Sequence, residues 1–254
     1  MPDPFFTWLD ALDTRHRRDL SFQEIRRSVQ ALSSLYVERR GRINEGAALD
    51  GAGKRAAFAS YFAPLHFLLI REIVGALGSL EVNALLDLGC GTGVAGAAWA
   101  SAMESRPRVI GVDRSSWAAA EARWTYGVFG LDHTAKAADI NTLKLPERTA
   151  VVAAFILNEL SEEGRSRWRS VLLSSARRGN PVLIVEPIAK RLSPWWDEWA
   201  GEFAAIGGRS DEWRFAVTLP ERLALMDKAA GLDHRELTGR SLWAGGSPCD
   251  SLPT

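Results

Sequence analysis

Residues 85–100 read LLDLGCGTGVAGAAWA, and this stretch decides the fold. An apolar run ends at Leu88, and glycines then follow at alternate positions: Gly89, Gly91 and Gly93. An apolar run, a glycine-rich turn and a segment of small residues are typical of a strand that leads into a helix. Glycines let the chain turn sharply and let backbone N–H groups approach a ligand, with a helix N-terminus behind them. The stretch therefore predicts a ligand-binding turn.

Two ligand patterns overlap in this turn. Gly91, Gly93 and Gly96 spell the G-x-G-x-x-G of nicotinamide and flavin sites, whereas Asp87 begins the D-x-G-x-G-x-G of S-adenosylmethionine sites. A carboxylate at the end of the strand repels a pyrophosphate and attracts the ammonium group of the methionine half. The first predicted strand also begins only at residue 84, whereas dinucleotide folds usually open with it. Both points favour S-adenosylmethionine; the alternative is an oxidoreductase that binds NAD(P) or flavin.

Three further polar positions follow predicted strands. Asp113 ends "RVIGVD", where a carboxylate accepts hydrogen bonds from ribose hydroxyls in either kind of cofactor site. Asp139 can accept from the adenine amino group while Ile140 covers the ring, and Asn158 with Glu159 closes the apolar run "VVAAFIL". Each position has a structural alternative, as a turn residue or a helix cap.

The middle of the chain predicts an α/β fold with a doubly wound, mainly parallel, Rossmann-like sheet. Five short apolar runs alternate with helical segments, which is typical of βαβ units. The strand candidates are residues 84–88, 108–112, 134–138, 150–155 and 182–186. The helix before the last of them has an N-cap at Ser161 and ends before Pro181.

The two ends of the chain are less regular. Residues 1–80 predict a helical N-terminal cap. Residues 81–254 predict the domain that binds S-adenosylmethionine, the methyl donor. One helix has an apolar stripe at helical spacing: Phe22, Ile25, Val29, Leu32 and Tyr36. A loop follows over Gly41–Gly53, and Pro64 suits the first turn of the next helix.

Beyond residue 187 we predict two more helices and one strand. "SPWWDEWAGEF" predicts a helix with three tryptophans, and Thr218 with Glu221 predicts a capping box for the other helix. "HRELTGRSLWAG" then predicts a last, antiparallel strand.

Composition gives expectations about partners. The 254 residues carry 31 basic and 31 acidic side chains, which gives no whole-molecule attraction to nucleic acid or anionic membrane. Two cysteines, Cys90 and Cys249, make no metal set and favour a cytoplasmic protein. No signal peptide is recognised, and the apolar stretch 56–70 is too short to span a bilayer. We therefore expect no metal and no membrane; the oligomeric state stays open.

Residues 84–160 resemble a class I S-adenosylmethionine-dependent methyltransferase, through "LLDLGCGTG", "VIGVD", "AAD" and "ILNEL" in that order. The resemblance implies that the three loop glycines shape the methionine site, that Asp113 holds the ribose, and that Asp139 with Ile140 holds the adenine. The expected cofactor site is Asp87, Gly89, Cys90, Gly91, Gly93, Asp113, Arg114, Asp139, Ile140 and Asn158.

A narrower resemblance covers residues 20–190. "RRSVQALSSLYVERR", "RAAFASYFAPLHFLLIREIV", "ILNEL" and "LIVEP" are similar to the methyltransferase-like family of mitochondrial small-ribosomal-subunit assembly and its bacterial relatives. That family pairs the donor fold with contact to rRNA or the ribosome. Some members carry a cysteine-bound iron–sulfur cluster, but this chain lacks the cysteine set and no cluster is expected.

The sequence predicts an enzyme that methylates an unidentified acceptor, either rRNA or a small molecule. The candidate acceptor-side residues are Tyr61, His66, Glu159 and Glu186, each with an alternative packing or turn role. Trp195, Trp196 and Trp199 could cover an acceptor pocket or form a packing face. Because no acceptor-side catalytic motif is recognised, a non-catalytic ribosome-assembly or RNA-binding factor with the same fold is the alternative.

Overall fold

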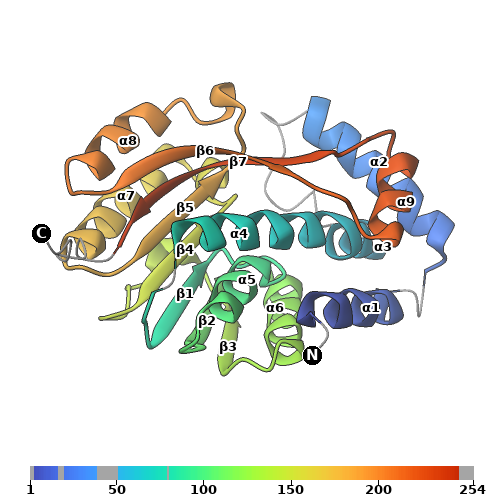
Figure 1. Ribbon diagram of the computed structural model, residues 1–254, viewed down its shortest axis with the longest axis horizontal. Coiled ribbons are helices and arrows are strands. Elements are labelled where there is room, and N and C mark those ends of the chain that lie inside the picture. The colour runs from blue at the N-terminus through green and yellow to red at the C-terminus, as the bar shows by residue number, and fades with distance from the viewer. Residues whose placement is uncertain (1–2, 17–19, 39–50, 79, 246–254) are drawn as a thin grey trace, which may run out of the picture. The chain divides into compact units, whose positions relative to one another are not determined.

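The computed structural model describes residues 3–16, 20–38, 51–78 and 80–245, with the side chains of 33–38 left out of the description (Figure 1). Its centre is a seven-stranded sheet with the order β3-β2-β1-β4-β5-β7-β6. The strands are β1 Ala84–Leu88, β2 Arg108–Asp113, β3 His133–Ala137, β4 Ala150–Ala154, β5 Val182–Glu186, β6 Arg209–Ala216 and β7 Glu236–Ala244.

The sheet is parallel from β3 to β5, and β7 joins β5 antiparallel. β1 lies between β2 and β4, so the strand order reverses on either side of β1. In open α/β sheets, ligands bind outside the carboxyl ends of the strands at such a reversal. The glycine-rich stretch follows β1 directly and therefore lies at this place.

Side chains alternate between the two faces of β1, and different helices cover the two faces. Asp87 points to the face covered by α5 (Val94–Ala102) and α6 (Ser116–Val128), because its carboxylate contacts both helices. Leu86 belongs to the opposite face, where α7 (Glu162–Arg177) and α8 (Trp196–Ala204) pack.

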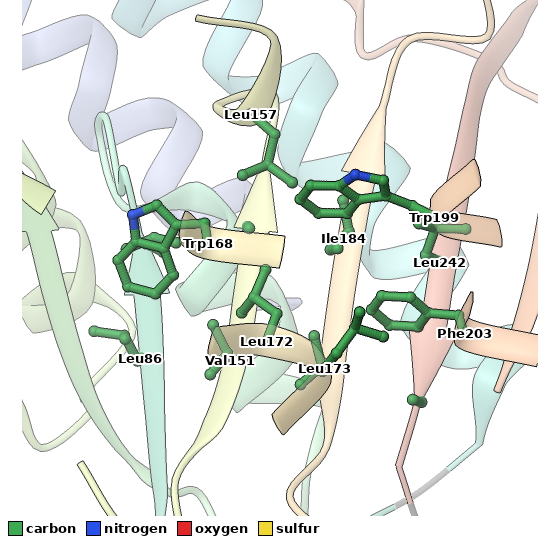
Figure 2. Close-up of a cluster of buried hydrophobic side chains, with 14 of the residues drawn as sticks. Leu86, Val151, Leu157, Trp168, Leu172, Leu173, Ile184, Trp199, Phe203 and Leu242 are labelled. Carbon is green, nitrogen blue, oxygen red and sulfur yellow. The ribbon is translucent and has the colours of Figure 1, made fainter. Parts of the chain in front are cut away.

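A large apolar cluster fills the face below α7 and α8 (Figure 2). Trp168 from α7 lies toward Leu86 of β1, whereas Trp199 and Phe203 from α8 lie toward Ile184 of β5 and Leu242 of β7. Trp195 and Trp196 are also buried in it. The tryptophans of "SPWWDEWAGEF" therefore pack as a helix face against the sheet.

The chain forms two compact units. One contains Met1–Leu69 and Arg214–Leu237, and the other contains Ile70–Trp213 and Thr238–Thr254. The helical unit is thus built from two separate segments of the chain, whereas the sequence predicted a cap from residues 1–80 alone. Its helices are α1 Pro4–His16, α2 Phe22–Glu38, α3 Ala52–Ala57, the π-helical turn η2 Phe58–Phe62, the start of α4 Ala63–Leu77, and α9 Glu221–Ala229.

The segment Ala52–Leu77 is helical throughout, with the π turn in its middle. Pro64 lies just after this turn; it has no N–H to donate to the carbonyl of Ser60, so it favours a break in the regular α-helical bonding there. By length and composition alone, these 26 residues could cross a membrane, but 72% of the most apolar window is buried inside the protein. That burial is typical of a core helix.

The predicted strands agree with β1 to β5 within one or two residues, and the last strand with β7. Ser161 caps α7, as predicted, by accepting a hydrogen bond from the Gly164 amide at 3.2 Å. β6 is absent from the prediction. The predicted capping box at Thr218 is wrong, because α9 begins at Glu221 with Pro220 at its N-cap and no side-chain cap bond.

Some predicted features lie outside the description. Most of the predicted loop Gly41–Gly53 does so, as does Cys249. The stripe of α2 is buried at Ile25, Val29 and Leu32, and the side chain of Tyr36 is not described.

Candidate active site

The turn after β1 is built from residues in the left-handed region of backbone space. The φ angles are 64° at Gly89, 50° at Gly91 and 82° at Gly93. Residues with a Cβ pay roughly 1–2 kcal/mol for this conformation, which explains the alternate glycines. The Gly93 amide donates to the Cys90 carbonyl at 2.7 Å and closes the turn.

The three glycines differ in what surrounds them. A Cβ at Gly89 would lie 2.3 Å from Cγ1 of Ile156, and a Cβ at Gly93 would lie 2.9 Å from Cα of Ala122. A Cβ at Gly91 would meet nothing within 4 Å. Gly89 and Gly93 are therefore required for packing, whereas a Cβ at Gly91 would point into open space.

Asp87 is 1% exposed. Its Oδ2 accepts hydrogen bonds from the Gly96 amide and the Tyr126 hydroxyl, each at 2.8 Å. Burial raises the pKa of Asp87 to about 7, although both hydrogen bonds lower it. A Cβ at Gly96 would lie 2.7 Å from Oδ2, so the last glycine of the nicotinamide-like pattern is needed for the approach to Asp87. The attraction of Asp87 for a ligand ammonium stays a prediction.

Asp113 at the end of β2 holds the turn from its other side. Its Oδ2 accepts from the Gly91 amide at 2.9 Å, and its Oδ1 accepts from the Ser115 amide at 2.8 Å. Each carboxylate oxygen has a second lone pair, so the side chain can still accept from ribose hydroxyls. Arg114 beside it is exposed.

Two loop side chains are buried. Cys90 is a free thiol, and burial raises its pKa well above the usual value, so it stays protonated. Thr92 is 3% exposed, and its hydroxyl has no hydrogen-bond partner among the described residues. An unpaired buried hydroxyl beside the open space at Gly91 suits a ligand, and the sequence reasoning missed Thr92. The available signal was a hydroxyl residue between two glycines of the turn.

Asp139 is the N-cap of a short 3-10 helix, η3 (Ile140–Thr142), and its Oδ1 accepts from the Asn141 amide at 2.9 Å. The side chain is exposed, while Ile140 is 7% exposed. Asp139 is therefore a helix cap, which is the structural alternative that the sequence left open. It leaves the predicted contact with adenine open, because one capping bond uses only part of the carboxylate.

The segment after β4 contacts the glycine turn through Ile156 and is held by Glu186 at the end of β5. The first residue of the segment, Phe155, has a φ of 60°. Glu186 Oε1 accepts from the Leu157 and Asn158 amides at 3.0 and 3.3 Å, and Oε2 accepts from Asn158 Nδ2 at 2.7 Å. Glu186 is fully buried, which raises its pKa to about 8. Glu186 therefore holds this segment in place through three hydrogen bonds.

Asn158 therefore has both ends of its amide engaged, because its Oδ1 also accepts from Trp195 Nε1 at 3.0 Å. Asn158 therefore links the segment after β4 to Trp195, the N-cap residue of α8. Glu159, in contrast, is exposed in the same short 3-10 helix, η4 (Leu157–Glu159). Of the predicted acceptor-side residues, Glu159 and Glu186 share this edge of the sheet.

Tyr61 and His66 belong to the helical unit. Tyr61, in the π turn, donates to Asp227 of α9, and the pKa of Tyr61 is raised by burial. His234 contacts the same carboxylate through Nδ1 at 2.5 Å and through its amide at 2.7 Å. Burial raises the pKa of Asp227, but these hydrogen bonds lower it overall. The sequence reasoning missed Asp227 and His234.

His66 packs edge-to-face on Phe58, and burial lowers its pKa to about 4. It is therefore a neutral imidazole near neutral pH and a weak base. No group of three or more His, Cys, Asp or Glu side chains in the described part of the chain could hold a metal ion.

Comparisons with known proteins agree on the kind of domain. Residues 85–178 match the family model of a methyltransferase domain. None of the curated proteins matches the sequence significantly. Two solved structures of similar fold are a SAM-dependent methyltransferase from Leishmania major and the mitomycin 7-O-methyltransferase MmcR.

The Leishmania protein has a TM-score of 0.51 and 12% identity, with 76% of each chain covered. MmcR has a TM-score of 0.50 and 14% identity, with 97% of this chain and 74% of that chain covered. At these identities the likeness shows the fold alone, and the family model supplies the activity. The residues of the turn fit the donor, since Gly91 leaves room for it and Thr92 offers an unpaired hydroxyl. Residues 85–178 therefore form a methyltransferase domain, and the fold is the one seen in solved S-adenosylmethionine-dependent methyltransferases.

Proposed function

We propose that this enzyme methylates a small molecule bound at the carboxyl edge of the sheet, beside the segment that follows β4. The observation that carries the proposal is the contact of Ile156 with Gly89. It joins the donor-binding turn directly to the segment held by Glu186. An acceptor at this segment lies next to the donor turn.

The chemistry supplied by the bound donor is an electrophilic methyl group on a sulfonium. The protein's own contribution is mainly to position the two substrates, and a base is needed only if the acceptor keeps its proton. Asp113, the turn amides and Thr92 would hold the donor. Glu159, which is exposed at the same edge, is the candidate carboxylate for accepting that proton.

Replacing Asp113 tests the donor site. We expect Asp113→Ala to lower the affinity for S-adenosylmethionine by about 10- to 100-fold, because a hydrogen bond to a charged group contributes roughly 1.5–3 kcal/mol. Isothermal titration calorimetry measures this change. Asp132→Ala is the matched control, since that carboxylate is exposed and lies 3.9 Å from Arg108. Equal affinities in both variants would remove Asp113 from the donor site.

A second candidate, an rRNA or ribosome-bound acceptor, is favoured by the resemblance over residues 20–190. The balanced charge of the chain favours the small molecule, because RNA-binding surfaces are basic. The fold of MmcR, whose name describes methylation of mitomycin oxygen 7, also accommodates a small acceptor.

Binding of labelled small-subunit rRNA distinguishes the two candidates. We expect no binding at physiological ionic strength, since phosphate contacts need clustered basic side chains. A filter-binding titration at two salt concentrations measures it. Salt-sensitive binding, with methyl transfer to the rRNA, would replace the small-molecule proposal.

A further inference from the structure

Arg240 is a buried cation at the carboxyl edge of the sheet. It lies on β7 directly opposite Glu186, the last residue of β5, and it is 2% exposed. Its Nε and Nη2 atoms are buried and donate to no atom of the residues that the structure describes. A buried N–H group without a partner costs free energy, so this pair of donors is suited to a ligand.

The two donors form one edge of the guanidinium group, which matches a carboxylate in a bidentate pair. The same chain shows this pairing at Arg169 of α7. Arg169 Nε donates to Glu202 Oε2 at 2.6 Å, and Nη2 donates to Oε1 at 2.5 Å. Arg240 presents the same two atoms from a buried position, without such a partner.

The neighbours of Arg240 do not supply that partner. Glu186 uses both oxygens on the segment after β4, and it acts on Arg240 through its charge without accepting from Nε or Nη2. The ring of Trp196 lies against the guanidinium, 4.2 Å from Cζ to the ring centroid. The carboxylates of Asp197 and Glu212 act on Arg240 only through their charge and are exposed.

A second buried donor lies close to Trp196 along the chain. Ser193 is 2% exposed, and its hydroxyl has no partner among the described residues. Its carbonyl accepts from the Trp196 amide at 3.1 Å, which fixes Ser193 at the start of α8. Ser193 thus offers a second unpaired hydrogen-bonding group, three residues before Trp196 in the chain.

We propose that Arg240 binds a carboxylate of the methyl acceptor through Nε and Nη2, so that the acceptor is a small organic acid. This inference rests on the proposed function and specifies its substrate class. Contacts within one unit connect the two sites: Arg240 faces Glu186, Glu186 holds Leu157, and the preceding Ile156 contacts Gly89. Because the ring of Trp196 lies over the guanidinium, a carboxylate bound at the Nε and Nη2 edge changes the surroundings of this ring.

Benzoate is the probe, and benzamide is its uncharged counterpart. In the full-length protein with S-adenosylhomocysteine present, we expect benzoate to bind and to change the tryptophan fluorescence. We expect Arg240→Lys to weaken benzoate binding by about tenfold or more, because an ammonium keeps the charge but loses the two-pronged edge. Benzamide should bind the unmodified protein at least about tenfold more weakly than benzoate does.

Arg169→Lys is the matched control, because it removes the same edge from a partly exposed ion pair. It should leave benzoate binding unchanged. Thermal unfolding and calorimetric affinity for S-adenosylmethionine, measured for each variant, report on folding and on the donor site. Absence of donor affinity in the unmodified protein would contradict the proposed function. If donor affinity is intact, two results would overturn the carboxylate site. One is that benzoate does not bind, and the other is that it binds the unmodified protein and Arg240→Lys equally.

Discussion

Gly89→Ala is expected to lower the free energy of unfolding by about 2–4 kcal/mol and the donor affinity by about tenfold or more. The φ angle of 64° is costly for alanine, and the new Cβ would lie 2.3 Å from Cγ1 of Ile156. Ile156 has to move, and the segment after β4 moves with it. Urea denaturation measures the stability, and calorimetry measures the affinity for S-adenosylmethionine.

Two variants separate strain from steric overlap. Gly91→Ala has a similar φ of 50° but no neighbour within 4 Å, so it should cost only about 1–2 kcal/mol of stability. It should still weaken donor binding, because its methyl group enters the open space. The double variant Gly89→Ala/Ile156→Ala should lose less free energy of unfolding than the sum of the losses in the two single variants. Equal stability of the two glycine variants would contradict the packing role of Gly89.

Asp87→Asn is expected to flatten the pH dependence of stability. Burial raises the pKa of Asp87 from 3.8 to about 7, so the folded state binds this proton more tightly than the unfolded state. The stabilisation is complete below about pH 4 and is lost as the pH rises through about 7. The unmodified protein should therefore lose up to about 4 kcal/mol more than Asp87→Asn between pH 4 and 8. Urea denaturation across this range measures the difference.

The same variant also tests the predicted attraction for the donor's ammonium group. Asparagine keeps an oxygen for the Gly96 amide and the Tyr126 hydroxyl, so the turn should hold its shape. Weaker donor binding by Asp87→Asn at pH 8 would support the electrostatic role, and unchanged binding would limit Asp87 to holding the turn. Parallel pH profiles of stability would show that burial does not shift its pKa.

The sheet was predictable because its strands are short apolar runs with clear boundaries. β1 and β5 were predicted residue for residue, since the glycine turn and Pro187 mark their ends. β6 was not, because "RSDEWRFA" lacks an apolar run and alternates exposed with half-buried side chains. The sequence signal for such an edge strand is weak.

The donor site was predictable where the backbone dictates the residue, as at Gly89 and Gly91. The roles of the carboxylates were harder, because a carboxylate that follows a strand can bind a ligand, an amide or both. Glu186 was a candidate for catalysis; its hydrogen bonds with Leu157 and Asn158 give it a structural role, and the catalytic role stays a prediction. Arg240 could not be found from sequence, because its register opposite Glu186 depends on an antiparallel pairing between distant segments.

The contact between Ile156 and Gly89 has a consequence for the order of events during turnover. The donor turn and the acceptor-side segment share one apolar contact, so movement of either changes the energy of the other. Thermodynamic linkage makes such an effect mutual: a donor that fixes the turn tightens acceptor binding by the same factor as the acceptor tightens donor binding. We therefore expect Ile156 to contribute to cooperativity between the donor and an acceptor bound at this segment.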